Sequence, residues 1–371
     1  MRVQVVDPSA YTPPYDHALC AALARAGADV ELVTSRFLYG PVPRGDGYRV
    51  RELFYRHSTR RGLASPSRMP LKLLEHAPDM LRYRRVASRA DVVHYQWLTV
   101  PPIDLRLLAP ARPRVLTAHD VLPREPRRGQ IAATRRLVRK MDAVVVHSQR
   151  GATRLRDELE VDPKRVHVIP HGAFDYLTRL PDEVPLPREL ADVEGPVILC
   201  FGLMRPYKGI DVLLEAFRHV RGAELWVVGM PRMEMGPLKR LAARAPGNVR
   251  FVERFVTDPE VPAFFRRADI VVLPYREIDQ SGVLYTALAF AKPLVLSRVG
   301  GFVEVCERHD AARLVTPGDP SSLAGALNGL LIDPAARARL AAAAAAAAAG
   351  PYSWDTVAER TLALYRELLG S

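Results

Sequence analysis

Cysteine is scarce in this sequence, and the motifs that depend on it are missing. Three cysteines are spread over 371 residues, and no Cys-x-x-Cys pair occurs. This spacing disfavours a disulfide scaffold and a zinc ribbon, and it is compatible with a reducing cytoplasm. The only long unbroken apolar stretch, residues 341–349, consists of alanine alone. It is too short to span a bilayer, which needs about 20 residues, so we expect a helix there.

Several motifs of common enzyme classes are also missing. The chain has no Gly-x-Gly-x-x-Gly, no Gly-x4-Gly-Lys-Ser/Thr, no Asp-x-Asp and no His-Glu-x-x-His. These absences count against nicotinamide or flavin binding, P-loop hydrolysis, Asp-x-Asp sugar transferases and zinc proteases. His167 and His171 flank a strand and a proline, so we expect no metal site there. No signal peptide is expected either, because Val3–Val6 starts an alternating pattern at once.

Lysine is rare too. The chain has six lysines, while lysine and arginine together number 53 against 41 acidic residues. Arginine therefore carries almost all of the basic charge behind the formal net charge of +12. An excess of arginine and alanine is typical of a bacterial genome rich in GC. It also suits a chain that meets phosphates or anionic surfaces, and composition alone does not separate these interpretations.

Basic residues gather in the first half of the chain. Residues 56–89 contain nine of them against Glu75 and Asp79, and residues 124–140 contain seven against Glu125. We expect solvated helix faces. The alternative is peripheral docking on an anionic membrane. The residues that would make this contact are Leu81, Arg82, Tyr83, Arg84 and Arg85.

Short β-branched runs recur along the chain, with helix-like stretches between most of them. Near-continuous apolar strands that alternate with helices are typical of parallel sheets covered on both faces. Six runs in each half predict two similar Rossmann-like, doubly wound α/β domains. The strands expected in the first half are Val3–Val6, Asp29–Thr34, Asp91–Tyr95, Arg114–Ala118, Ala143–His147 and Arg165–Ile169. Those expected in the second half are Val197–Phe201, Glu224–Val228, Val249–Val252, Ile270–Pro274, Pro293–Ser297 and Arg313–Thr316.

The two domains are expected at residues 1–180 and 195–350. A linker is predicted at residues 181–194, which are rich in proline and poor in apolar side chains. Near the end of the chain, apolar residues recur at near-helical spacing after Ser353, a residue that suits a helix N-cap. We expect this last helix, residues 352–371, to pack back on the first domain.

A basic loop follows the first strand of the second half. Two domains that face each other would place the carboxyl ends of both sheets around one cleft, where ligands of such folds bind. In this loop Gly202 and Gly209 permit tight turns and close backbone approach. Arg205 and Lys208 bracket a helix start, where a guanidinium, an ammonium and the helix dipole together suit a diphosphate. Alternatively, both are solvated basic residues of a loop.

A second loop follows the fourth strand of that half, with small and polar residues at another helix start. It runs from Glu277 through Gln280, Ser281 and Gly282 to Val283. Backbone N–H groups at such a start offer hydrogen bonds to an anion. Taken alone, the segment is typical of an ordinary helix cap. Two anion sites at neighbouring strand ends of one domain favour a shared ligand.

Three elements, in this order and with this domain layout, resemble family 4 glycosyltransferases of the GT-B fold. They are Ile169-Pro-His171-Gly172, Arg205-x-x-Lys208-Gly209, and residues 277–305 with their Lys-Pro and Gly-Gly-x-x-Glu parts. The resemblance covers essentially the whole chain and implies two Rossmann-like domains facing across a cleft. It also implies transfer of a sugar from a nucleoside diphosphate to an acceptor hydroxyl, with retention and without a metal or other cofactor.

The resemblance further implies roles for single residues. Arg205 and Lys208 would hold the donor diphosphate and stabilise the leaving group in place of Mg²⁺. Glu277 would be the first glutamate of the family's Glu-x7-Glu element, and His119 would face the sugar from the first domain. An alternative for His119 is a capping or core-edge role. The residues expected to bind the donor are Gly202, Arg205, Lys208, Gln280, Ser281, Gly282, Val283 and Thr286. Those expected in the acceptor pocket or the cleft are Tyr11, Tyr15, Asp120 and His171.

Two positions depart from the family pattern. The second glutamate of Glu-x7-Glu is missing, and Tyr285 or Thr286 occupies its place. A neutral hydroxyl binds the donor ribose more weakly than a carboxylate does. The Gly-Gly turn after the first strand is replaced by Thr12-Pro-Pro-Tyr15. We expect Tyr11 and Tyr15 to stack on an acceptor ring there, or the segment to be a stiff surface loop.

Together these observations predict a hexosyltransferase-type glycosyltransferase. Its expected partners are a nucleotide-sugar donor and a small-molecule, glycan or lipid-linked acceptor, with peripheral contact to an anionic membrane. Two alternatives stay open: a nucleotide-sugar 2-epimerase on the same fold, and a nucleotide-sugar-binding protein that lost its activity with the second glutamate. Nucleic-acid binding is not expected, because no helix-turn-helix, RNA-recognition or finger pattern accompanies the basic residues.

Overall fold

The chain folds into two compact α/β units. The computed structural model describes residues 1–43, 45–122, 128–245 and 247–370. The first unit consists of Met1–Gly172 and Trp354–Ser371, and the second of Ala173–Ser353. Each unit has its own parallel sheet, as the sequence predicts. The last helix of the chain, which we expected to pack on the first domain, belongs to that unit.

The first domain is built on a seven-stranded parallel sheet in the order β3-β2-β1-β4-β5-β6-β7. The six expected strands are present, and β3 is an additional one at the edge. Its strands are β1 (Arg2–Asp7), β2 (Asp29–Ser35), β3 (Arg49–Phe54), β4 (Val92–Tyr95), β5 (Arg114–Thr117), β6 (Ala143–Val146) and β7 (Val166–Val168). Its helices are α1 (Pro13–Arg25), α2 (Arg56–Thr59), α3 (Arg68–Ala87), α4 (Pro101–Leu107), α5 (Gln130–Val138), α6 (Gln149–Leu159), η1 (Pro163–Arg165) and α15 (Trp354–Gly370).

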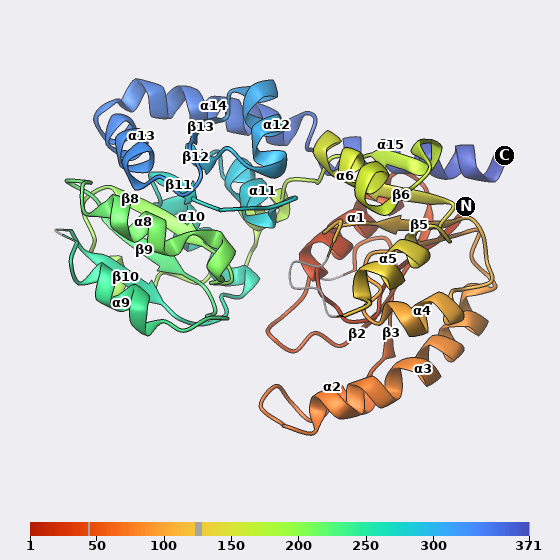
Figure 1. Ribbon diagram of the computed structural model, residues 1–371. Coiled ribbons are helices and arrows are strands. Elements are labelled where there is room, and N and C mark those ends of the chain that lie inside the picture. The colour runs from red at the N-terminus through yellow and green to blue at the C-terminus, as the bar shows by residue number, and fades with distance from the viewer. Residues whose placement is uncertain (44, 123–127, 246, 371) are drawn as a thin grey trace. The chain divides into compact units, whose positions relative to one another are not determined.

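Helices cover both faces of this sheet (Figure 1). On one face, buried side chains of α3, α5 and α6 share a single apolar cluster with alternate residues of the strands, among them Val93. The next residue of β4, His94, points to the opposite face, where it hydrogen-bonds Tyr365 Oη of α15 at 2.6 Å. Helix α1 packs against α15. This two-sided cover explains why the inner strands are apolar along their whole length.

The second domain contains a six-stranded parallel sheet in the order β10-β9-β8-β11-β12-β13. All six expected strands are present. They are β8 (Val197–Phe201), β9 (Glu224–Val228), β10 (Val249–Val252), β11 (Ile270–Leu273), β12 (Leu294–Ser297) and β13 (Ala312–Val315). The helices are η2 (Asp175–Arg179), α7 (Arg188–Ala191), η3 (Pro206–Lys208), α8 (Ile210–Phe217), α9 (Gly236–Ala242), η4 (Asp258–Glu260), α10 (Val261–Arg267), α11 (Gly282–Ala289), α12 (Gly300–His309), α13 (Pro320–Ile332) and α14 (Pro334–Ala349).

The alanine stretch forms most of α14, as expected for the best helix former. The carboxylate of Asp333 caps this helix by accepting a hydrogen bond from the Ala336 backbone N–H at 2.8 Å. Ala344 and Ala347 are buried, and α14 packs against α11. Small side chains thus let α14 lie close to the helix that begins at the candidate donor site.

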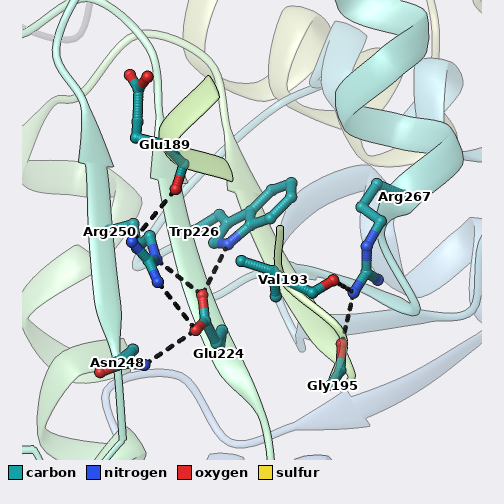
Figure 2. A network of polar contacts seen from close by, with 8 residues as sticks. All are labelled: Glu189, Val193, Gly195, Glu224, Trp226, Asn248, Arg250 and Arg267. Atoms are coloured by element: carbon teal, nitrogen blue, oxygen red, sulfur yellow. Dashed lines mark hydrogen bonds and ion pairs between the residues drawn. The ribbon is translucent and has the colours of Figure 1, made fainter. Parts of the chain in front are cut away.

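The expected linker is instead part of the second domain, so the boundary falls earlier than the sequence predicts. Figure 2 shows the contacts that fix it: Arg250 donates to the Glu189 carbonyl at 3.2 Å, and Arg267 donates to the Val193 carbonyl at 2.6 Å. Glu224 holds Arg250 in place with a bond of 2.9 Å between its Oε2 and the arginine Nε. The Leu190 side chain is buried as well. Proline content signals a break in secondary structure, but these carbonyl contacts decide the domain to which the segment belongs.

Candidate active site

Two loops of the second domain meet where its strand order reverses, between β8 and β11. Ligands of doubly wound folds bind at this switch point, beyond the carboxyl ends of the strands. The backbone N–H of Arg276, after β11, donates to the Tyr207 carbonyl, after β8, at 2.8 Å. The Arg276 guanidinium also donates to the Pro206 carbonyl at 3.1 Å. The two loops therefore form one continuous surface.

Lys208 lies in the middle of this surface and is 5% exposed. Its Nζ donates to the Phe201 carbonyl at 3.4 Å and lies 5.1 Å from the centroid of the Tyr275 ring. A Cβ at Gly202 would lie 2.8 Å from this Nζ, and Gly202 has a φ of +100°. Glycine therefore lets the lysine lie against the backbone. A buried ammonium has lost most of its water, so it attracts an anionic ligand strongly.

The loop that carries Lys208 is fixed by a second glycine and an ion pair. Gly209 has a φ of +65°, and a Cβ there would lie 2.1 Å from the Pro274 carbonyl oxygen. Arg276 pairs with Asp211 at 2.6 Å and holds the pKa of that carboxyl below its ordinary value. Arg205, in contrast, has no carboxylate partner within the described part of the chain. Its positive charge is thus not neutralised by the protein.

The start of α11 lies against Gly202, the glycine that also contacts Lys208. A Cβ at Gly202 would lie 3.0 Å from Val283 Cγ2. The residues before the helix are anchored, since Ser281 Oγ lies 3.3 Å from Tyr275 Oη and Tyr285 Oη donates to Gln280 Oε1 at 3.1 Å. The first N–H groups of a helix have no partner inside it and carry partial positive charge. The segment from Gln280 to Val283 therefore adds a helix dipole to the lysine and the arginine.

Glu277 and Thr286, which were also expected at this site, are not grouped with Lys208 by any of the contacts above. Glu277 is exposed on the loop between β11 and α11. Thr286 is 7% exposed, and its hydroxyl donates to the Gly282 carbonyl of its own helix at 3.0 Å. This internal bond uses the hydroxyl proton in the free protein, and contact of Thr286 with a donor ribose stays a prediction. The place of the missing glutamate holds a satisfied, neutral side chain.

At the switch point of the first sheet, between β1 and β4, aromatic rings take the place of the glycines. Trp97 Nε1 donates to Thr12 Oγ1 at 2.9 Å, and the Trp97 ring centroid lies 5.4 Å from that of Tyr11. His119, after β5, stacks on Trp97 at 5.1 Å with 14° between the ring planes. Tyr11 is 60% exposed, so this surface is open to a ligand ring.

A chain of hydrogen bonds fixes the proton of His119. The Ile169 carbonyl can only accept, so His147 Nδ1 donates to it, at 3.0 Å. Burial lowers the pKa of His147 to about 4, so its Nε2 carries no proton and accepts from His119 Nδ1 at 3.4 Å. Burial and the neighbouring His147 lower the pKa of His119 well below its ordinary value. His119 is therefore neutral, and its Nε2 carries a lone pair.

The Nε2 of His119 faces the side-chain amide of Gln96, with 3.0 Å to Oε1. The amide nitrogen of Gln96 is buried and has no hydrogen-bond partner among the described residues. A half-turn of this amide, which exchanges its oxygen and nitrogen, gives both groups a partner. His119 Nε2 thus accepts from Gln96 in the free protein and can accept from a sugar hydroxyl that displaces the amide.

Tyr15 and His171 lie inside the first domain and do not line an open pocket. Tyr15 is 3% exposed, and its ring lies edge-on to His119, His171 and Trp354. It therefore cannot stack on an acceptor ring, and that expectation is corrected. His171 Nδ1 donates to the Gly172 carbonyl at 2.7 Å, and a Cβ at Gly172 would lie 2.4 Å from the Trp354 ring. The His-Gly pair thus seats the start of α15.

Asp120 is half-buried in the loop that carries His119. The sequence reasoning missed three residues of this region: Gln96, Trp97 and His147. The available signal was the position of Gln96 and Trp97, which come directly after the fourth apolar run. The run itself, β4, was predicted, and polar or aromatic side chains directly after a strand of a parallel sheet are candidates for a ligand site.

Of the residues expected to contact a membrane, three have partners inside the first domain, while Leu81 and Arg85 are exposed. Tyr83 is completely buried in the first core, Arg82 pairs with Asp79 at 2.9 Å, and Arg84 donates to the Leu108 carbonyl at 2.7 Å. Arg82 and Arg84 thus satisfy acceptors of their own domain, and contact of this part of α3 with a membrane stays a prediction. Part of the second basic stretch, residues 124–127, lies outside the described residues.

The described residues contain neither a candidate metal site nor a helix that could span a membrane. In residues 1–43, 45–122, 128–245 and 247–370, no group of three His, Cys, Asp or Glu residues is arranged to hold a metal ion. Within the same ranges, no helix has the length and apolar character needed to cross a membrane. The three cysteines are free thiols.

Comparison with known proteins assigns both domains. Residues 15–173 match the sequence profile "Glycosyltransferase Family 4", and residues 195–333 match "Glycosyl transferases group 1". A D-inositol 3-phosphate glycosyltransferase of Xylanimonas cellulosilytica is 30% identical over 382 residues, covering 94% of this chain and 89% of its own.

Solved structures have the same architecture. A sucrose-phosphate synthase of Thermosynechococcus elongatus superposes with a TM-score of 0.78 at 19% identity, covering 100% of this chain and 99% of its own. The Anabaena protein HepE, crystallised with UDP-glucose, superposes with a TM-score of 0.74 at 18% identity, covering 99% of this chain and 100% of its own. The chain therefore belongs to glycosyltransferase family 4, and it is a hexosyltransferase-type enzyme of the GT-B fold.

Proposed function

We propose that the enzyme transfers a glycosyl group from a nucleoside diphosphate sugar to an acceptor hydroxyl, with retention and without a metal cofactor. The observation that carries the proposal is the position of Lys208. It is a buried ammonium at the switch point of the second sheet, beside the start of α11 and near Arg205, for which the described residues provide no carboxylate partner. The retention follows from the family resemblance alone.

The proposed chemistry is stabilisation of the leaving group. As the bond between the sugar and the diphosphate breaks, negative charge grows on the phosphate oxygens. Lys208, Arg205 and the first N–H groups of α11 are fixed before the reaction and are complementary to that charge, so they stabilise the transition state more than the ground state. Their combined charge supports a mechanism in which a divalent cation is not needed.

His119 is proposed to orient a sugar hydroxyl. Its neutral ring and the lone pair on Nε2 suit a hydrogen-bond acceptor rather than an acid at neutral pH. Trp97 supports the imidazole from one face, and Tyr11 offers an exposed ring beside it. A hydroxyl-bearing ring that stacks on Tyr11 and donates to His119 is the kind of acceptor that this edge fits.

The acceptor is proposed to be a small polyol, a glycan or a lipid-linked sugar. The related Xylanimonas protein is named for D-inositol 3-phosphate. The donor nucleotide is proposed by analogy to the Anabaena protein, whose structure contains UDP-glucose. Uridine, guanosine, thymidine and adenosine diphosphates therefore form the natural panel of donors, with the uridine compound first.

The test is a thermal-shift and turnover screen of UDP-, GDP-, dTDP- and ADP-sugars in EDTA. A ligand at a hundred times its Kd stabilises the fold by about 2.7 kcal/mol, so the true donor is visible before an acceptor is known. Proton NMR of the product then gives the anomeric configuration. Transfer that requires added Mg²⁺ contradicts the metal-independent proposal. Tight binding without turnover on any acceptor favours the degenerate binding protein, and a changed sugar configuration in the unbound donor favours the epimerase.

Contact with an anionic membrane is proposed at a place other than the one the sequence indicated. At the start of α3, Met69, Leu73 and Leu74 are 62%, 58% and 73% exposed. Exposed arginines lie just before them, at positions 60 and 61. Apolar side chains with basic residues suit an anionic lipid surface. Loss of vesicle co-sedimentation in L73E/L74E would support this contact, and a change of oligomeric state instead would indicate a second copy as the occupant.

A further inference from the structure

A second group of cations lies in the first domain, in a pocket at the carboxyl ends of β1, β2 and β3. The pocket has an interior of about 30 Å³, which is room for one small group but not for a whole sugar. Three basic residues from two different segments contribute to its wall. The residues used below are Ser9, Arg36, Tyr55, Ser58, Arg68 and Lys72.

Lys72 is the most enclosed of the three cations. Its Nζ lies 4.6 Å from the centroid of the Tyr55 ring and 5.8 Å from that of Tyr11. Among the described residues it has no ion pair and no hydrogen bond. Burial and the nearby charge of Arg68 lower the pKa of Lys72 to about 8, against a smaller opposing effect of Asp7. An added negative charge would relieve both effects.

Two further polar atoms in the pocket lack partners. Arg68 Nε is buried and has no hydrogen-bond partner within the described ranges. Ser9 Oγ is also buried; it lies near the Tyr55 hydroxyl but makes no hydrogen bond of good geometry within the described ranges. Leaving a buried donor unsatisfied costs about 1–3 kcal/mol, and more for a charged group. Two such atoms beside an unpaired lysine point to a ligand with several acceptor oxygens.

The carboxylates near these cations are occupied by backbone groups. Asp7 accepts from the N–H groups of Ser9 at 3.0 Å and Thr12 at 3.2 Å, and also from Tyr11. Glu75 accepts from the N–H groups of His57 at 2.7 Å and Ser58 at 2.9 Å. Other arginines of this domain do find carboxylates. Examples are Arg2 with Asp91, Arg49 with Asp29 and Arg51 with Glu31. In the pocket, in contrast, none of the three cations has a carboxylate partner among the described residues.

We propose that this pocket binds a phosphate group, and that the acceptor of the enzyme is a phosphorylated molecule whose hydroxyl lies toward Tyr11 and His119. Arg68 and Lys72 supply charge-assisted hydrogen bonds, Ser9 supplies a hydroxyl, and Arg36 adds charge at the exposed rim. The second part of the proposal rests on the proposed function. The first part, phosphate binding, does not.

A phosphate fits these features better than a carboxylate does. Its oxygens point in four directions and accept from donors on opposite walls, while a planar carboxylate faces one side. Its double charge at neutral pH also matches three cations that have no carboxylate partner among the described residues. The small interior is consistent with a terminal phosphate whose parent molecule stays outside.

The test uses the small number of lysines. Reductive ¹³C-methylation keeps the charge of each amine and gives one NMR signal for each of six lysines and the N-terminus. K72R and K208R assign the two signals of interest. Inorganic phosphate at millimolar concentration is then titrated into the full chain. Calorimetry on the unmodified protein gives the affinity without relying on the label.

We expect phosphate to shift the Lys72 signal and to raise the pKa of this amine, while sodium chloride of equal ionic strength does neither. R68Q should weaken phosphate binding at least tenfold, because it removes charge-assisted bonds. R89Q removes the same charge from an exposed position beyond the other end of α3 and should leave the affinity within twofold. An unmoved Lys72 signal, an equal response to chloride, or an R68Q variant that binds phosphate normally would overturn the proposal.

The same spectra separate this proposal from the proposed function. A nucleoside diphosphate should move the Lys208 signal, so a response there without one at Lys72 leaves the donor site standing and removes the phosphate pocket. Glycerol 3-phosphate and phosphatidylglycerol vesicles present the same group from solution and from a lipid. Whichever of them displaces phosphate from Lys72 identifies the source of the acceptor, and failure of both contradicts a phosphorylated acceptor.

Discussion

The two domains share a strand order around their switch points, yet they hold polar groups there in different ways. In the second domain, glycines with positive φ press two loops together and leave a buried lysine beside a helix start. In the first domain, the rings of Trp97 and Tyr15 pack against a neutral histidine, Tyr11 lies beside Trp97, and the cations lie in a separate pocket. The edge of the second sheet is a rigid charged surface, formed by residues 202–209 and the start of α11, which we call the cradle. The edge of the first sheet is an aromatic surface with hydrogen-bonding groups.

Under the proposed function, this difference suits two kinds of ligand. A diphosphate is the same in every nucleotide sugar, so fixed backbone and fixed charge suit it. Sugars and polyols vary in the position of their hydroxyls, so stacking and neutral hydrogen bonds suit them. The same sheet topology thus supports a fixed, charged binding surface in the second domain and a more adaptable aromatic binding surface in the first.

The largest expected difference between the two domains is the loss of folding stability in acid. Burial lowers the pKa of His17 and His147 to about 4 and of His94 to about 3. Below pH 6.5 the unfolded chain binds protons that the folded domain excludes, so stability is complete above pH 6.5 and falls toward pH 4. The loss is about 1.4 kcal/mol per pH unit for each histidine.

Hydrogen exchange followed by mass spectrometry at pH 7 and pH 5 measures this effect for each domain. The described histidines of the second domain, His219 and His309, are not buried, so that domain is the internal control. We expect the first domain to open first. Earlier opening of the second domain would show that the histidines do not control acid stability.

Removal of the charge from the cradle should have the next largest effect. K208A is expected to lower turnover by about 10²–10³ because the departing diphosphate loses its buried cation. R205A should act in the same direction. The matched control is K239A, which removes an exposed lysine that pairs with Glu253 at 2.7 Å in the same domain. Near-normal rates in both active-site variants, with unchanged melting temperatures, would remove these residues from the mechanism.

Glycine substitutions test whether the cradle is rigid. G209A places a Cβ 2.1 Å from the Pro274 carbonyl oxygen at a φ of +65°, so we expect a loss of about 2–4 kcal/mol in unfolding free energy. G222A has a similar φ of +70° but meets no atom within 4 Å. It should cost about 1 kcal/mol, the backbone strain alone. Equal losses in urea denaturation would mean that the close approach contributes nothing.

Replacement of His119 should have a moderate effect on sugar transfer and little effect on nucleotide binding. H119A is expected to lower transfer about 10- to 100-fold and to leave nucleoside diphosphate affinity within twofold. Its lowered pKa keeps His119 neutral, so activity should show no loss from its protonation between pH 8 and pH 6.5. H57A, an exposed histidine of the same domain, is the control. Equal losses of transfer and nucleotide binding would indicate general damage to the fold.

The smallest effect is expected at Thr286. Its hydroxyl already bonds the Gly282 carbonyl, so T286V should change donor affinity and turnover by less than twofold. T286E restores a carboxylate at this place and should change donor affinity more than turnover. Direct binding and kinetic measurements on both variants decide the matter. A large loss in T286V would mean that the hydroxyl contacts the donor after all.

The sequence predicts the fold well because both sheets are covered on two faces. Their inner strands are continuous apolar runs, which are easy to recognise. The exception is β3, an edge strand with four exposed residues that include Arg49 and Arg51. It pairs with β2 along its length but buries only Leu53 and Phe54 at its end, which is too short an apolar run to recognise.

The candidate sites show a similar division. Glycine and lysine after β8 were predicted as a unit, because a Gly-rich turn before a helix is visible in the sequence. The phosphate pocket was not predicted, since Ser9, Arg36 and Lys72 come from three separate segments that only the sheet order brings together. Tyr15 was misjudged for the same reason: its burial depends on His171 and Trp354, which are far away in the chain.

A crystal structure of the enzyme with a bound nucleoside diphosphate sugar is the decisive measurement. We predict phosphate oxygens within about 3.2 Å of Lys208 Nζ and of the first N–H groups of α11, with Arg205 on the same diphosphate. A donor that binds elsewhere, or one whose diphosphate points away from Lys208, would contradict the proposal that the second domain holds the leaving group.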